Sequence, residues 1–133
     1  MKKAFTLVEL MVATCILAIG LVGIARSLLS AVSALDYSNS IVQKVEFIDN
    51  VLSEVEKRSQ AKDGFDSSDQ DILGLLTEKQ TQAKDEGIGD LNWNAQELEE
   101  NITDFQISVS WEQGNNKKDA SLGTYLLSKK ASK

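Results

Sequence analysis

The stretch that decides the fold is FTLVELMVATCILAIGLVGIA, from Phe5 to Ala25. Only Thr6, Glu9 and Thr14 within it are polar, and it contains no Lys or Arg. At about 1.5 Å per residue, a helix over this run is roughly 31 Å long, which is enough to cross a bilayer. The run therefore predicts a membrane-spanning helix.

The helix is expected to continue past the span, because neither Pro nor Gly occurs from Arg26 to Arg58. Apolar residues recur there at steps of three and four, which places them on one face of a helix. They are Tyr37, Ile41, Val45, Ile48, Leu52 and Val55. We therefore expect one helix from Phe5 to Arg58, apolar all round in its first half and amphipathic in its second.

A hairpin is predicted near the C-terminus. Apolar residues alternate with polar ones from Phe105 to Trp111, which is the period of a half-buried strand. The polar stretch 112–119 predicts a turn, and 120–128 predicts the returning strand. A two-stranded hairpin is marginal alone, so we expect it to pack on the apolar stripe of the helix. The predicted fold class is α+β: a lollipop of one long helix on a small antiparallel sheet.

The middle of the chain gives weaker patterns. Residues 63–71 and 85–90 have the composition of loops. Residues 72–86 have helical character, which Gly74 weakens. Residues 95–100 are expected to form one short helical turn.

Composition excludes several kinds of chemistry. The 133 residues carry a net charge of −6, and nineteen of the 20 acidic residues follow Leu35. An acidic domain is unsuited to nucleic acid, which requires a basic face. With no His and with Cys15 as the only Cys, a Ser-His-Asp triad, a Cys-His dyad, His-ligated zinc and an intrachain disulfide are ruled out. We expect no enzyme, no cofactor and no metal site.

Charges around the span indicate orientation and a partner. Lys2 and Lys3 precede the span and Arg26 follows it, which favours a cytoplasmic N-terminus and a head outside the cytoplasm. Glu9 places a carboxylate in what should be hydrocarbon. Such a group costs several kcal/mol, so its presence suggests a partner.

The segment MKKA-FTLVELMVATCILAIGLVGIA closely resembles the N-terminus of type IV pilins and type II secretion pseudopilins. The resemblance rests on a short basic leader followed by an apolar helix that opens with Phe5 and carries Glu9. It covers roughly the first 30 residues, and beyond them only the architecture agrees.

The resemblance implies a specific processing and assembly route. In this family a membrane aspartyl peptidase cuts just before the Phe, here between Ala4 and Phe5, and then N-methylates the new terminus at Phe5. Glu9 corresponds to the family's signature acid, which pairs with the N-terminal amine of a neighbouring subunit. The physics agrees, because a buried charge is tolerable when an opposite charge meets it.

The sequence departs from the usual family pattern in three places, and the last two departures point to a minor pilin or pseudopilin. Ala4 stands where Gly usually precedes the cut, and Arg26 stands where many major pilins carry a helix-kinking Pro. The disulfide loop common near the C-terminus of major pilins is absent, since the chain has one Cys.

Other polar and aromatic groups have two interpretations each. A calcium loop is one interpretation of the acids in 63–71, which are Asp63, Asp66, Asp69 and Asp71. Their spacing misses the known pattern, and a solvated acidic loop is favoured.

Stacking on a ligand is one interpretation of the aromatic residues Trp93, Trp111 and Tyr125. Packing is favoured, with Trp111 in the core and Trp93 as the more exposed contact. Carboxylates at Glu97, Glu99, Glu100 and Asp104 could suggest hydrolysis, but an exposed charged face is favoured.

The sequence thus predicts three parts: a leader over 1–4, a transmembrane assembly helix over 5–30, and a periplasmic head over 31–133. The predicted function is a structural subunit of a pilus-like filament or secretion pseudopilus, held in the bacterial inner membrane. Its expected partners are other pilins, the prepilin peptidase and the inner-membrane assembly platform. The alternative is a single-pass anchored adaptor that does not polymerise.

Overall fold

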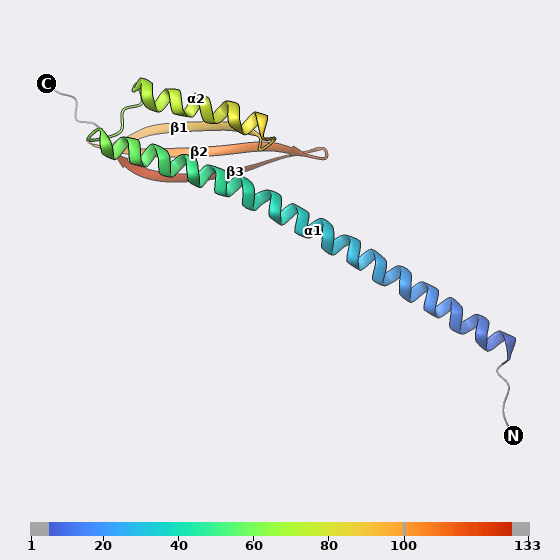
Figure 1. Ribbon diagram of the computed structural model, residues 1–133. Helices are drawn as coiled ribbons and strands as arrows, with labels where there is room; N and C mark the ends of the chain where they lie inside the picture. The colour runs from blue at the N-terminus through green and yellow to red at the C-terminus, as the bar shows by residue number, and fades with distance from the viewer. Residues whose placement is uncertain (1–5, 100, 129–133) are drawn as a thin grey trace. The chain divides into compact units, whose positions relative to one another are not determined.

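The computed structural model describes residues 6–99 and 101–128 (Figure 1). Its elements, in chain order, are two helices and then three strands: α1 (Leu7–Ala61), α2 (Gln70–Asp85), β1 (Asp90–Glu99), β2 (Ile102–Gln113) and β3 (Asn116–Leu127). The chain divides into two compact units, Met1–Ser40 and Ile41–Lys133, and α1 contributes to both. The predicted α+β class, with one long N-terminal helix and a small antiparallel sheet, is confirmed.

The second unit, the head, is built on a three-stranded antiparallel sheet in the order β1-β2-β3. The predicted hairpin is confirmed as β2 and β3, which pair continuously from Ile102 opposite Leu127 to Gln113 opposite Asn116. The turn between them is tighter than predicted. Gly114 supplies its left-handed backbone, with φ +62°, a conformation that side-chain-bearing residues rarely adopt.

Residues 95–99 form strand rather than the predicted helical turn, so that prediction is wrong. They belong to β1, in which Ala95 pairs with Phe105 and Gln96 with Asp104. Ala, Gln, Leu and Glu favour helix when they act alone. Cross-strand pairing with the strongly β-forming β2 overrides that preference, because strand formation depends on the neighbouring strand.

The core lies between one face of the sheet and the two helices of the head. From β2, Phe105, Ile107 and Val109 are fully buried, in the alternation that the sequence predicted. From the helices, the buried apolar residues are Ile48, Val51, Leu52, Val55, Ile72, Leu75, Leu76 and Ala83. Burying such side chains from water is the main stabilising contribution to a domain of this size.

The apolar stripe of α1 is confirmed only in part. Ile48, Leu52 and Val55 are buried as predicted, but Tyr37 and Val45 are 38% and 36% exposed. Lys44 takes a buried position on this side of the helix, with its Nζ 4.8 Å from the centre of the Trp111 ring. The cation–π contact lets the long lysine side chain cover the aromatic ring at the place where the apolar stripe was expected.

α2 begins and ends with ordinary capping structures. The Asp69 carboxylate accepts a hydrogen bond from the Asp71 backbone N–H at 2.9 Å, which caps the N-terminus of the helix. At the other end Ile88 N–H bonds to the Ala83 carbonyl at 2.9 Å, across Gly87 with φ +67°. The helical prediction for 72–86 is confirmed. Gly74 lies inside α2, at a position where an added Cβ would meet no atom within 4 Å.

Candidate assembly site

The N-terminus of α1 holds Glu9 in a reciprocal cap. Glu9 Oε2 accepts hydrogen bonds from the Thr6 backbone N–H and from Thr6 Oγ1, both at 3.0 Å. In return the Glu9 backbone N–H donates to Thr6 Oγ1 at 3.3 Å. This is a capping box, in which the acid three residues into the helix satisfies the N–H of the residue that starts it.

The cap sets the direction of the Glu9 carboxylate, which is held back toward the start of the helix. The N-terminal end of a helix dipole attracts negative charge, so the cap holds the carboxylate where the dipole favours it. Sequence reasoning missed this arrangement. The spacing Thr-x-x-Glu from Thr6 to Glu9 is the signal that could have found it.

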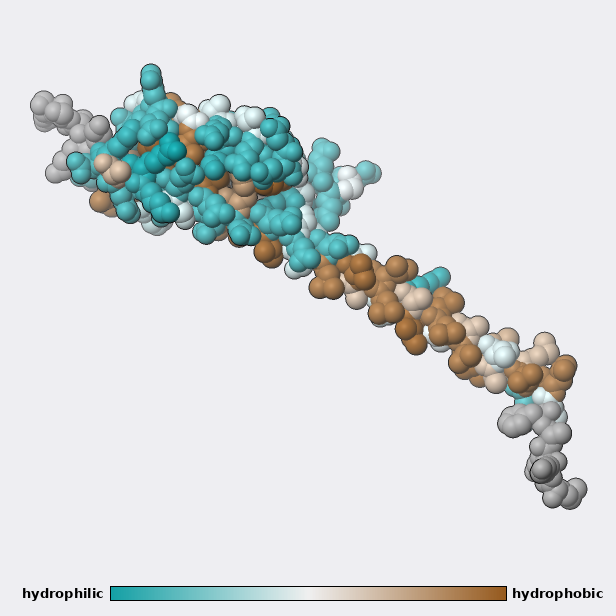
Figure 2. All heavy atoms as spheres, in the orientation of Figure 1, coloured by the Kyte–Doolittle hydropathy of each residue, from teal (hydrophilic) through white to brown (hydrophobic). Residues whose placement is uncertain are grey.

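The described part of the first unit leaves its apolar surface exposed. All residues from Thr6 to Asn39 are exposed, and Figure 2 shows the apolar side chains along this part of α1. Within the described part of the chain, α1 is the one helix that is long and apolar enough to cross a membrane. Surface of this kind requires lipid or other apolar helices around it.

Apolar side chains continue beyond Arg26. Leu28, Leu29, Val32 and Leu35 are each more than half exposed. From Leu7 to Leu35 the helix is roughly 43 Å long at 1.5 Å per residue, whereas the hydrocarbon core of a bilayer is about 30 Å thick. Part of this surface therefore extends past the hydrocarbon of an untilted span.

Four of the predicted site residues, Lys2, Lys3, Ala4 and Phe5, lie outside the described residues. Their roles as leader charges, cleavage junction and methylated terminus remain predictions. Glu9 is the predicted site residue that the structure describes, and it is exposed on α1.

Two of the acids considered for a calcium loop, Asp69 and Asp71, are engaged by cations of the head, and Asp66 Oδ1 accepts a hydrogen bond from the Ser68 backbone N–H at 2.8 Å. Lys62 Nζ lies 2.8 Å from Asp69 Oδ2 and 3.3 Å from Asp71 Oδ2. Arg58 bridges Asp71 at 3.0 Å and Glu54 at 3.1 Å, and so ties the end of α1 to the start of α2. In the described part of the chain, no group of three or more acidic or Cys side chains is arranged to hold a metal ion.

These ion pairs shift the protonation of two groups. The hydrogen bond to Asp69 raises the pKa of Lys62 above its ordinary value. Partial burial acts to raise the pKa of Glu54, but the hydrogen bond from Arg58 and the charge of Lys79 outweigh it and lower the pKa. Both charged forms are thus favoured in the folded head.

The aromatic residues differ from their predicted exposure in one case. Trp93 is partly buried and stacks on Phe105 with ring centroids 6.1 Å apart, so it is a core contact rather than the exposed one. Trp111 packs against the core as predicted. Tyr125 is 73% exposed on the sheet. Of the acids for which an exposed charged face was favoured, Glu97 is exposed, whereas Asp104 is half-buried and accepts a hydrogen bond from Gln106 Nε2 at 2.9 Å.

Comparison with known proteins gives one match. Residues 1–25 match the family model described as the prokaryotic N-terminal methylation motif. No curated protein and no solved structure matches the chain. The motif is typical of type IV pilins and pseudopilins. With a long N-terminal helix and an antiparallel sheet, the α+β fold is pilin-like, and the apolar span indicates a membrane-anchored protein.

Proposed function

We propose that this pilin-like chain is a minor structural subunit of a type IV pilus-like filament or a type II secretion pseudopilus, and not an enzyme. In the proposed route the prepilin peptidase removes residues 1–4 by cutting between Ala4 and Phe5, and Phe5 is then N-methylated. The leader charges Lys2 and Lys3 stay in the cytoplasm. Residues 5–30 span the inner membrane, and residues 31–133 form a periplasmic head.

One observation carries the proposal: a carboxylate stands at the N-terminal end of an apolar helix that no other described part of the chain covers. Glu9 and all its neighbours up to Asn39 are exposed. A filament of like helices covers this surface and brings the Phe5 amine of one subunit to Glu9 of another. Pairing with a fixed opposite charge offsets the cost of holding the carboxylate away from water.

The hydrogen bonds from Thr6 position the Glu9 carboxylate for this pairing. Thr6 holds one oxygen of the carboxylate, Oε2, at the start of the helix. Cleavage before Phe5 leaves the Thr6 amide intact, so the cap persists in the mature chain. The new amine is then carried by Phe5, one residue before Thr6 in the chain, and in the proposed filament it pairs with the Glu9 of a neighbour.

The length of the apolar surface favours a filament over a lone anchored adaptor. A single anchor needs about 20 apolar residues, which the segment before Arg26 supplies. Leu28, Leu29, Val32 and Leu35 extend the exposed apolar surface further. Packing of neighbouring helices covers these residues, whereas a lone span leaves them in water. The filament contacts, the peptidase and the inner-membrane assembly platform are the proposed partners.

The test uses two substitutions at one position. Glu9→Gln keeps the cap, because Gln serves as well as Glu in a capping box, but it removes the charge. Glu9→Ala removes both. We expect both variants to insert into the membrane normally and to lower the amount of chain in sheared filaments by more than about tenfold, since breaking a buried ion pair costs about 3–5 kcal/mol.

Glu46→Gln is the matched control, because Glu46 is an exposed acid on the head part of the same helix. It should assemble as the unmodified chain does. If Glu9→Gln assembles normally and Glu9→Ala does not, the residue acts as a cap and the proposed charge pairing is wrong. If both variants assemble normally, the assembly role of Glu9 is wrong.

A further inference from the structure

The two edges of the head sheet are protected very differently. On β1, the Gln80 side chain from α2 donates to the Leu91 carbonyl at 3.1 Å, and a register shift lies between Glu97 and Glu99. Covering helices, bulges and charges are the means by which proteins block unwanted strand pairing. On β3, residues 120–127 (ASLGTYLL) carry no charge at all.

The direction of the backbone groups on β3 follows from its last residues. Phe65 N–H donates to the Leu127 carbonyl from the open side, whereas Ser128 N–H donates to Asn101 on the β2 side. The pairing of β2 with β3 has no register shift, so this alternation runs along the strand. Ser121, Gly123 and Tyr125 therefore direct their N–H and C=O groups to the open edge, in the same phase as Leu127.

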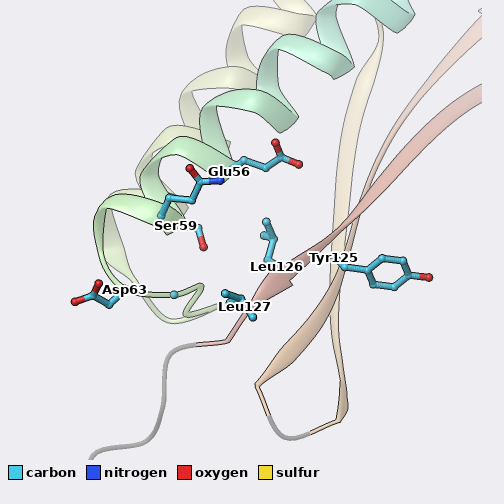
Figure 3. Close-up of a pocket in the computed structure, with 8 residues that line it drawn as sticks. Glu56, Ser59, Asp63, Tyr125, Leu126 and Leu127 are labelled. Carbon is cyan, nitrogen blue, oxygen red and sulfur yellow. The ribbon is translucent and has the colours of Figure 1, made fainter.

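Side chains on the two faces of β3 flank this open edge with different chemistry. On the face away from α1, Tyr125 and Leu127 are 73% and 71% exposed, and Ile102 stands opposite Leu127. A pocket of about 550 Å³ lies between β3 and the end of α1, and β3 lines it with Leu126 from the face toward α1 and with Tyr125 and Leu127 at the strand edge. Figure 3 shows Leu126 directed toward α1 and Tyr125 directed away from it.

The pocket is acidic. Among the described residues, its lining includes the carboxylates of Glu56 and Asp63 and no Lys or Arg. Glu56 Oε1 accepts a hydrogen bond from Thr124 Oγ1 at 2.7 Å, which fixes the carboxylate beside β3. A basic side chain entering from the open edge would meet these two acids.

We propose that the open edge of β3 binds an extended segment of another protein, which adds to the sheet as a fourth strand. Its backbone pairs with Ser121, Gly123 and Tyr125. Its apolar side chains lie beside Tyr125 and Leu127, and a Lys or Arg on its other face enters the pocket at Glu56 and Asp63. A second copy fits less well, because acidic residues outnumber basic ones in 41–133 and two such heads repel each other. The residues of this surface all belong to the head, 41–133, so this proposal stands independently of filament assembly.

The experiment uses the full chain in detergent micelles and three synthetic octapeptides. The first alternates Val with Lys, the second alternates Val with Glu, and the third is the Val-Lys peptide with its outward amides N-methylated. Binding is measured by fluorescence anisotropy, and amide hydrogen exchange is followed by NMR. We expect the Val-Lys peptide to bind and to slow exchange at Ser121, Gly123 and Tyr125, and the other two peptides to bind at least about tenfold more weakly.

Two variants sharpen the result. Ser121→Pro removes an outward N–H, which edge strands tolerate, and should abolish binding. Glu56→Gln keeps an oxygen for Thr124 but loses the charge, and should weaken the Val-Lys peptide by about fivefold to tenfold. Glu46→Gln should leave binding unchanged.

Three outcomes overturn the proposal. One is no binding of the Val-Lys peptide, and another is exchange protection that lies away from β3. The third is a dimer of the peptide-free chain that Ser121→Pro dissociates, because the edge then belongs to a second copy. If Ser121→Pro fails to fold, the comparison with the N-methylated peptide decides the same question on the unmodified chain.

Discussion

α1 is one continuous helix with two parts that differ in the exposure of their side chains. From Leu7 to Asn39 its residues are exposed whatever their polarity, and most of them are apolar. From Ile41 to Ala61 the helix buries one side, at Lys44, Ile48, Val51, Leu52, Val55 and Ser59. The difference shows that the distribution of apolar residues around a helix indicates the environment that the helix requires. An apolar surface all round requires apolar surroundings, and one apolar stripe requires a single packing partner.

This comparison also separates two sources of stability. The head part is stabilised by contacts within the chain, so its substitutions should change the unfolding of the head. The exposed apolar part finds its contacts outside the chain, so its substitutions should change insertion and assembly instead. The first two of the following predictions test that separation, and the third tests one ion pair within the head.

The largest expected effect is in the core. Ile48→Ala removes a side chain that is fully buried against the sheet and should destabilise the head by about 2–5 kcal/mol. The measurement is denaturant unfolding of the full chain in detergent, followed by Trp fluorescence. Leu29→Ala is the control, because Leu29 is 69% exposed, and it should change head unfolding by less than about 0.5 kcal/mol. Equal effects of the two substitutions would contradict the separation.

A charge introduced into the exposed apolar part should change the free energy of membrane insertion. We expect this change to be as large as, or smaller than, the loss of head stability caused by Ile48→Ala. Ile19→Lys places an ammonium group near the middle of the span and should cost about 2.5–3.5 kcal/mol of insertion free energy. The measurement is the fraction of chain that resists carbonate extraction from membranes. Val42→Lys introduces the same charge at an exposed position of the head part and should leave that fraction unchanged. Loss of insertion in the second variant would show that the apolar requirement extends into the head.

The smallest expected effect is electrostatic. The lowered pKa of Glu54 means that its contribution is fully present above its ordinary pKa of 4.5 and is lost as the pH falls through the lower, folded-state pKa. Between neutral pH and about pH 3, Glu54→Gln should lose about 0.3–1 kcal/mol less than the unmodified chain, as expected for a partly exposed ion pair. Unfolding curves at several pH values test this, with Glu46→Gln as the control. The raised pKa of Lys62 has the opposite sign, and its contribution is lost only in strongly alkaline solution.

The elements with a long, regular pattern could be predicted from the sequence. The helix expected over 5–58 is α1, and the hairpin expected from Phe105 onward is β2 and β3. These segments specify their structure locally, through uninterrupted apolar character or strict alternation. β1 could not be predicted in the same way. Its residues Ala95 and Gln96 are strand because β2 lies beside them, and the sequence of β1 does not contain that information.

The candidate site was predictable in identity but not in geometry. Glu9 stands out because an acid is rare in an apolar run. Its hydrogen bonds from Thr6 were missed, because the acid was considered only as half of an ion pair between subunits. The inward side of α1 was misjudged for a related reason. A buried Lys44 over Trp111 replaces the expected Val45, and only the folded sheet brings that ring to the helix.

The central claim is that the chain becomes an assembly subunit by losing its leader, which places a free amine close to Glu9. The most direct measurement is the intact mass of the full chain purified from membranes of cells with an active prepilin peptidase and of cells without it. We predict a chain that begins at Phe5 and carries one added methyl group in the first case, and a chain that retains residues 1–4 in the second. A chain that keeps residues 1–4 in both kinds of cell would contradict the account.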